Sequence, residues 1–221
     1  VSSFVYPGGI LAVHSQGRSK DQIWSALKNK NVYGTSGPRI LLWFDIINSP
    51  DGTQPMGSEI TMSQNPKFIV RAAGSFKQKA GCPVESIDSL SSERLEYLCA
   101  GECYNPSNKR HLIERIEIIK ITPQEYAGEA ISPLIQDAWR TLPCFGESEC
   151  VVEFEDENYS RDSVYYVRAI QQGTLAINGG KGIGGKDFKL CRGSFRTDLS
   201  DDCLEMDNER AWSSPIYLNK P

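Results

Sequence analysis

Residues 19–44, SKDQIWSALKNKNVYGTSGPRILLWF, combine a capped helix, a glycine-rich turn and a hydrophobic strand. Ser19 is followed three residues later by Gln22, the spacing of a capping box that satisfies free backbone donors at a helix start. Ile23, Trp24 and Leu27 form one apolar stripe on this helix. Glycines and a proline at 34–38 then predict a sharp turn.

The hydrophobic run after this turn predicts a strand over 40–47, buried on both faces because it hardly alternates. Further strands are expected at 10–13, 67–73, 112–121, 151–154, 164–170 and 213–218, and a short helix at 91–99. Residues 122–146 are expected to form a loop with one helical turn near Trp139. The pattern predicts a mainly β chain, α+β overall. Residues 1–38 are expected to form a strand–helix–turn segment. Residues 39–221 are expected to form an antiparallel β-sandwich-like domain with an insertion at 82–109.

The composition excludes several classes of partner. A net charge of −4 with scattered Lys and Arg argues against a nucleic-acid surface. The most hydrophobic run, 40–47, is strand-sized and interrupted by Asp45, so no membrane insertion is expected. Because the chain starts at Val1 without a leader pattern, we expect a processed product or a piece of a longer polypeptide.

Seven cysteines lie after residue 80, mostly in polar segments: Cys82, Cys99, Cys103, Cys144, Cys150, Cys191 and Cys203. This number favours disulfides and an oxidising compartment, so we expect a periplasmic or secreted protein. Proximity in sequence favours the bridges 144–150 and 191–203, with one more among residues 82, 99 and 103. The sequence does not fix this connectivity, and an odd count leaves one thiol over.

A phosphate loop is the first candidate for a site, because residues 180–186, GKGIGGK, fit the pattern GxxxxGK. Such a loop needs Ser or Thr next, for magnesium, and then a helix, whereas Asp187 follows here. A surface loop is the better interpretation.

Metal and nucleophile patterns are incomplete as well. His14 and His111 are the only histidines, and the spacings Cys99-x₃-Cys103 and Cys144-x₅-Cys150 lack the tight knuckle of a zinc ribbon. An acidic run lacks the spacing of a calcium loop: Asp198, Asp201, Asp202, Glu205, Asp207 and Glu209. Cys103 and His111 could form a nucleophile–base pair, but no third group to orient them is evident. The sequence therefore predicts no catalytic, cofactor-binding or metal-binding residue in this chain.

Five segments carry a resemblance to a known family: PGGILAV (7–13), the stretch 18–44, PMGSE (55–59), VYYVRAI (164–170) and ERAWSSPIY (209–217). In this order they resemble the C-terminal part of domain-of-unknown-function 3604 proteins, which look like members of the PHP superfamily, named for polymerase and histidinol phosphatase. The cysteine-bearing segments 82–109 and 191–203 resemble a bacterial envelope subgroup.

The resemblance implies a metal-dependent phosphoesterase built on an α/β barrel, with residues 1–38 as the tail of that barrel. The divalent-metal ligands would lie upstream of Val1, so no catalytic residue is transferred to this chain. We expect a non-catalytic β-rich C-terminal region with a structural, substrate-covering or assembly role, and contact through residues 19–30 with the same polypeptide or a second copy. No ligand is predicted. The alternatives are a hydrolase whose metal-binding half is missing, and a carbohydrate- or protein-binding sandwich using Trp139, Tyr159, Tyr165 and Trp212.

Overall fold

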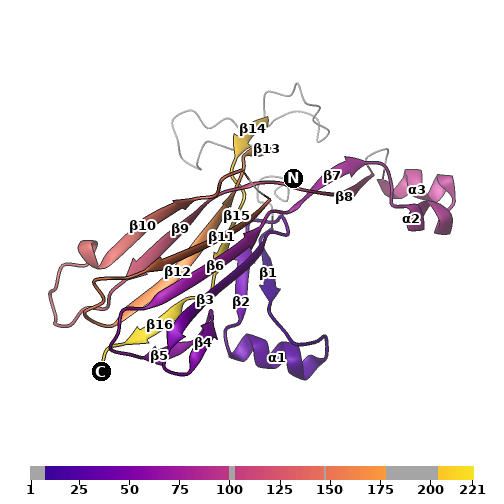
Figure 1. Cartoon of the computed structure of the whole chain (residues 1–221). Helices are drawn as coiled ribbons and strands as arrows, with labels where there is room; N and C mark the ends of the chain where they lie inside the picture. Colours follow the sequence, from indigo (N-terminus) through magenta and orange to yellow (C-terminus); the bar gives the residue numbers. More distant parts are fainter. Residues whose placement is uncertain (1–7, 100–102, 147, 178–203) are drawn as a thin grey trace.

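Two β-sheets packed face to face form the body of the molecule (Figure 1). The structure is a computed structural model that describes residues 8–99, 103–146, 148–177 and 204–221. Strands dominate, almost all pairs are antiparallel, and two disulfides close loops outside the sheets. The predicted mainly β, sandwich-like fold with cysteine-stapled loops is therefore confirmed.

The larger sheet has eight strands centred on the long strand β12. Its main path runs β1 (Ile10–Val13), β2 (Val32–Thr35), β15 (Arg210–Ser213), β12 (Ser163–Gln171), β16 (Ile216–Asn219) and β5 (Glu59–Thr61). The other edge of β12 pairs with β9 (Ile113–Ile121), and β9 pairs with β10 (Ile135–Pro143). Only the β16–β5 pair is parallel among these. Residues from both ends of the chain thus share one sheet.

The smaller sheet has the order β11 (Glu149–Glu155), β6 (Lys67–Ala73), β3 (Leu41–Ser49) and β4 (Gly52–Pro55). Strand β3 buries Leu42, Phe44 and Ile46 completely, whereas Trp43 on its opposite face is exposed. The prediction that this strand is buried on both faces is wrong. The outer face of β3 is half-buried apart from Trp43, and Asp45 accepts a hydrogen bond from Arg71 there at 2.9 Å.

Aromatic rings fill the space between the sheets. Phe68 of β6 lies with its ring centroid 4.9 Å from that of Phe154 and 4.9 Å from that of Tyr165, which belongs to the opposite sheet. Phe44 stacks on Phe68 at 5.4 Å. Trp139 meets Tyr165 edge-on at 6.1 Å and closes one side of the group. Ring pairs in this distance range add a geometric preference to their burial, which fixes how the sheets face each other.

Strand β10 corrects the prediction of a loop with a helical turn near Trp139. The segment pairs with β9 but shifts register between Gln136 and Arg140, and Ala138 between them has a positive φ of 50°. Such a bulge breaks the two-residue alternation that identifies a strand in a sequence. The pairing with β9 therefore defines β10 as a strand, although the sequence of β10 itself does not indicate one.

Helix α1 (Lys20–Lys28) begins as its sequence predicts. The backbone N–H of Gln22 donates to the Ser19 hydroxyl at 3.3 Å, and the Ser19 N–H donates to the Gln22 side chain at 3.3 Å, which completes the capping box. The expected turn at 34–38 is shorter than predicted, because Gly34 and Thr35 belong to β2. The turn itself uses Gly37 at φ 136°.

A two-stranded ribbon carries the predicted insertion away from the sandwich (Figure 1). Strands β7 (Phe76–Ala80) and β8 (Tyr104–Arg110) form the ribbon, and α2 (Val84–Ser89) and α3 (Ser92–Cys99) form its tip. The helix expected at 91–99 is confirmed as α3. The remaining described elements are a 3₁₀ turn (Ser132–Leu134) and a small ribbon of β13 (Thr174–Ile177) and β14 (Leu204–Asp207). No helix among the described residues is long and apolar enough to cross a membrane.

One ion pair is buried at the edge of the aromatic group. Asp156, only 1% exposed, accepts hydrogen bonds from Lys120 of β9, from the Tyr165 hydroxyl and, at 3.0 Å, from the Asn158 backbone N–H. Burial alone would raise the pKa of Asp156, but the bonds from Lys120, Tyr165 and Asn158 together lower it below its usual value. Burial and the same carboxylate raise the pKa of the Tyr165 hydroxyl. A charged Asp156 thus ties three strand ends together.

We expect Asp156→Asn to lower the free energy of unfolding by about 3 kcal/mol, since it leaves Lys120 as an unpaired charge next to the core. The stabilisation should be present above the ordinary carboxyl pKa of about 4 and should disappear as pH falls through the lowered pKa of the folded state. Urea unfolding of both proteins at several pH values measures this: their difference should shrink toward zero in acid.

Glu155→Gln is the matched control, because Glu155 pairs with Lys67 at the surface at 3.3 Å. An exposed pair of this kind contributes at most about 1 kcal/mol. The double variant Lys120→Met with Asp156→Asn should regain part of the lost stability, because it removes the stranded charge. Equal unfolding midpoints for Asp156→Asn and Glu155→Gln would contradict the role assigned to the buried pair.

Candidate functional site

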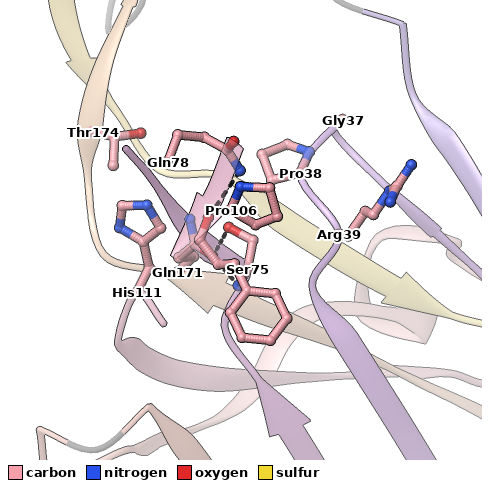
Figure 2. Close-up of a pocket in the computed structure, with 10 residues that line it drawn as sticks. Gly37, Pro38, Arg39, Ser75, Gln78, Pro106, His111, Gln171 and Thr174 are labelled. Atoms are coloured by element: carbon pink, nitrogen blue, oxygen red, sulfur yellow. Dashed lines mark hydrogen bonds between the residues drawn. The ribbon is translucent and has the colours of Figure 1, made fainter. Parts of the chain in front are cut away.

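A cleft with a volume of about 470 Å³ lies where the ribbon joins the sandwich (Figure 2). Pro38, Phe76 and Pro106 supply apolar walls. Its polar lining residues come from four different segments of the chain: Arg39, Ser75, Gln78, His111, Gln171 and Thr174. The cleft therefore depends on the way the chain enters and leaves the ribbon.

A close approach of two backbone segments shapes this junction. A Cβ atom on Gly74 would lie 2.0 Å from the carbonyl oxygen of His111, so only glycine fits there. The His111 N–H donates to the Ser75 carbonyl at 2.9 Å, and Arg110 Nη1 donates to the Gly74 carbonyl at 2.6 Å. The guanidinium of Arg110 also lies 3.8 Å from the ring centroid of Phe76. These contacts hold the two ends of the ribbon together.

Gln171 of β12 forms the buried polar floor of the cleft. Its Oε1 accepts two hydrogen bonds from Ser75, one from the backbone N–H at 2.8 Å and one from the hydroxyl at 2.9 Å. The Ser75 hydroxyl is thus directed at an amide oxygen, which cannot act as a base. Ser75 is held in place as a structural group and is not an activated nucleophile.

His111 is the titratable ring of the cleft (Figure 2). Burial, and then the positive charge of Lys77, lower the pKa of His111 below its ordinary value. The ring is therefore mainly neutral at neutral pH. Its Nδ1 is buried and has no hydrogen-bond partner in the described part of the chain. The cleft offers polar atoms for a small ligand, but the described residues do not assemble a nucleophile, base and orienting group there.

His14, considered above as a metal ligand, has a structural environment. Its Nε2 lies 2.8 Å from the carbonyl oxygen of Leu42, and its ring lies 5.2 Å from Tyr33 and 5.7 Å from Trp43. Burial raises the pKa of the neighbouring Tyr33 hydroxyl, although a bond to the Leu42 backbone opposes this. The only group of three or more candidate metal-ligating side chains within 4.8 Å among the described residues is Cys82, Cys99 and Cys103, so His14 has no partner ligands there.

Helix α1 is open to solvent on its polar and on its apolar side, and Ala26 alone in the helix is buried. Gln22, Ser25 and the C-cap residue Asn29 line a hollow of about 180 Å³ together with His14 and Asn31. The apolar stripe of Ile23, Trp24 and Leu27 is exposed, with Trp24 at 59%. Such a stripe is usually buried in a surface helix. The outward face of α1 is therefore a candidate contact surface.

The structure pairs four of the seven cysteines. Disulfides join Cys82 to Cys103 and Cys144 to Cys150, and Cys99 keeps its thiol. Cys191 and Cys203 lie outside the described residues, as do the loop 180–186 and the first three carboxylates of the acidic run (Asp198, Asp201 and Asp202). Of the rest of that run, Glu209 accepts a hydrogen bond from Ser36, and Asp207 accepts one from the Asn208 N–H at 2.8 Å.

The proposed pairing of Cys103 with His111 does not form. Cys103 precedes β8 and His111 follows it, so the seven-residue strand separates them. The Cys103 sulfur is also part of a disulfide, which leaves no thiolate to act as nucleophile or zinc ligand.

Sequence reasoning missed the residues of the cleft. Ser75 and Gln171 lie 96 positions apart and belong to no motif, so no spacing could have brought them together. The one local signal was Gly74, a glycine at the end of the strand pattern 67–73, which indicates a close approach of backbone.

One family model matches the chain. Residues 2–80 match the family described as "Protein of unknown function (DUF3604)". The matched part contains the β1–β2 hairpin, α1, strands β3 to β6 and the outgoing strand of the ribbon. No curated protein and no solved structure shows significant similarity to the chain.

The matched segment also connects two of the motifs on which the family resemblance rests. Tyr33, Gly34 and Thr35 of the stretch 18–44 pair in β2 with Ser213, Trp212 and Ala211 of ERAWSSPIY in β15. The second motif lies outside the match, yet it is the direct hydrogen-bonding neighbour of the first. Residues 2–80 are therefore similar to the DUF3604 family, and this match covers less than half of the chain.

Proposed function

We propose that this chain is the non-catalytic, β-rich C-terminal region of an exported PHP-like metallohydrolase, and that the outward face of α1 packs against the α/β barrel preceding it in the same polypeptide. The observation that carries the proposal is the exposure of α1, whose apolar stripe of Ile23, Trp24 and Leu27 is left open to solvent. Its role is to cover or orient the barrel, to contact substrate, or to support assembly.

Strand β1 provides a second open surface beside this helix. It pairs with β2 on one side, and none of the described strands pairs with its other side. Leu11 is 59% exposed and Ile10 41% exposed. An edge strand with exposed apolar side chains is usually covered in a native protein, because it otherwise promotes aggregation. A barrel packed on α1 and β1 covers both elements at once.

The chemistry then belongs to the barrel. Its His, Asp and Glu residues would hold divalent metal ions and supply Lewis-acid activation for phosphoester hydrolysis. The chain described here contributes a cleft with a buried polar floor at the base of the ribbon, without a nucleophile–base pair among its lining residues. Disulfides in two separate loops support export to an oxidising compartment, the periplasm or the cell exterior.

The structure does not favour a carbohydrate- or protein-binding sandwich built on Trp139, Tyr159, Tyr165 and Trp212. Tyr159 and Tyr165 are buried, and Trp139 packs against the core. Trp212 is half-buried in β15. A glycan-binding platform needs exposed ring faces, and these four aromatic residues do not provide one.

The contact face can be tested with the double variant Trp24→Ser, Leu27→Ser. In the 221-residue chain we expect the free energy of unfolding to change by less than about 0.5 kcal/mol, because both side chains are already exposed. In a polypeptide that includes the barrel we expect a loss of about 2 kcal/mol or more, because the same side chains become buried there. Chemical unfolding of both forms measures the difference.

Ile131→Ser is the control, since Ile131 is about as exposed as Trp24 but lies outside α1, just before the 3₁₀ turn at Ser132–Leu134. It should have the same small effect in both forms. A small effect of the α1 variant in both forms would contradict the proposed packing. If the variant instead converts a dimer of the 221-residue chain into a monomer, the face serves contact between two copies.

If catalysis belongs to the barrel, the polypeptide with the barrel and the 221-residue chain alone should differ in phosphatase activity. Native polypeptide with the barrel should bind divalent metal and hydrolyse a simple phosphomonoester, and chelation should abolish the activity. The 221-residue chain alone should do neither. Intact mass, metal analysis and a phosphatase assay on both forms measure this. Metal-dependent hydrolysis by the 221-residue chain would show that a catalytic site lies within it and would overturn the non-catalytic assignment.

A further inference from the structure

The tip of the ribbon has almost no core of its own. Neither α2 nor α3 contains a buried residue. Several of their large apolar side chains are exposed, among them Val84, Ile87, Tyr97 and Leu98. A segment with so few buried contacts is held in place chiefly by its covalent attachment. That attachment is the Cys82–Cys103 disulfide, which joins the end of β7 to the start of β8.

A third sulfur lies against this disulfide. Cys99, the last residue of α3, has its Sγ 2.8 Å from the Sγ of Cys103 and 3.9 Å from the Sγ of Cys82. The three side chains are all partly exposed. A thiolate exchanges with a disulfide by attacking one of its sulfurs, so the essential requirement is a thiol within reach of the bond. Cys99 meets this requirement, and Cys103 is the nearer target.

We propose that Cys82, Cys99 and Cys103 form an intramolecular thiol–disulfide exchange centre. The Cys99 thiol loses its proton to solvent, and the thiolate attacks Cys103 Sγ. A Cys99–Cys103 bond forms as the Cys82–Cys103 bond breaks, and Cys82 leaves as a thiolate that takes up a proton. One disulfide and one thiol are present before and after the step, so no external oxidant or reductant is needed. Attack by Cys82 on Cys103 reverses it.

The exchange moves the covalent constraint along the chain. The observed bridge spans 21 positions and encloses both helices of the tip. The alternative bridge spans 4 positions and encloses neither helix. After exchange, α3 stays tied to the start of β8 through its last residue, Cys99, whereas the segment before α2 loses its bridge to the ribbon, and the exposed apolar side chains of α2 gain freedom to contact a partner. The centre therefore acts as a switch for the tip, independent of the function proposed for α1.

The second disulfide lacks these features. Cys150 is buried in the core, and no described thiol lies near Cys144–Cys150. A buried bridge without a neighbouring thiol has no internal route for exchange. It provides a control within the same molecule.

Disulfide mapping of the 221-residue chain tests the proposal. The oxidised protein, purified with a metal chelator present, is incubated at pH 8, its thiols are alkylated with N-ethylmaleimide, and peptides are sequenced by mass spectrometry. We expect label on both Cys82 and Cys99, together with both bridges, 82–103 and 99–103. In Cys99→Ser the label on Cys82 should disappear. Label confined to Cys99 in the wild type after prolonged incubation would overturn the proposal, as would label on Cys82 in Cys99→Ser.

The rate of trypsin cleavage at the tip gives a second readout. Arg94 is the only Lys or Arg between Cys82 and Cys103, and Lys109 and Arg110 lie outside this segment, so cleavage within the segment reports on Arg94 alone. We expect Cys82→Ser, which leaves only the 99–103 bridge in this region, to be cut after Arg94 about tenfold faster than Cys99→Ser, which retains the 82–103 clamp. The wild type should lie between them. Equal cleavage rates in the two variants would show that the position of the bridge does not control the tip and would overturn the switch.

Discussion

Contact between Phe68 and Tyr165 is the interaction on which the rest of the structure depends, because it joins the two sheets at their centre. Phe44 and Phe154 extend the stack along the smaller sheet, and Asp156 anchors the Tyr165 hydroxyl at its edge. Every described feature of possible function lies outside this group. The sandwich is thus a rigid support from which three surfaces extend: the α1 face, the cleft and the ribbon tip.

The ribbon and the cleft depend on each other through a few backbone contacts. Gly74 and His111 approach too closely for any side chain at 74, and Gln171 ties Ser75 to the central strand β12. The base of the ribbon is therefore joined to the large sheet through Gln171 and to the small sheet through the end of β6. In contrast, the tip lies at the far end of a two-stranded ribbon, where few packed side chains oppose movement.

Local patterns in the sequence predict the elements that carry their own signals. The capping box at Ser19, the alternating strand at 112–121 and the short helix ending at Cys99 all form, because each depends on neighbours in the sequence. Strand β10 forms against its pattern because β9 supplies the partner and a bulge absorbs the mismatch. The cleft was beyond sequence reasoning for the same reason: Ser75 and Gln171 meet only after two sheets have packed.

The orientation of α1 was the least predictable feature, since a hydrophobic stripe indicates a buried face but not the protein that buries it. The hairpin that precedes and follows this helix is nevertheless part of the large sheet, through the pairing of β2 with β15 and the bond between Ser36 and Glu209. A division of the chain at residue 38 into a barrel tail and a β domain stays a prediction about descent. In the structure, β1 and β2 form the edge of the large sheet, and the next strand of that sheet is β15 at residues 210–213. The N-terminal hairpin therefore joins the sheet only when the C-terminal part of the chain is folded. Among the described residues of the N-terminal segment, the apolar stripe of α1 and the open edge of β1 are the apolar surfaces that the sheet leaves uncovered.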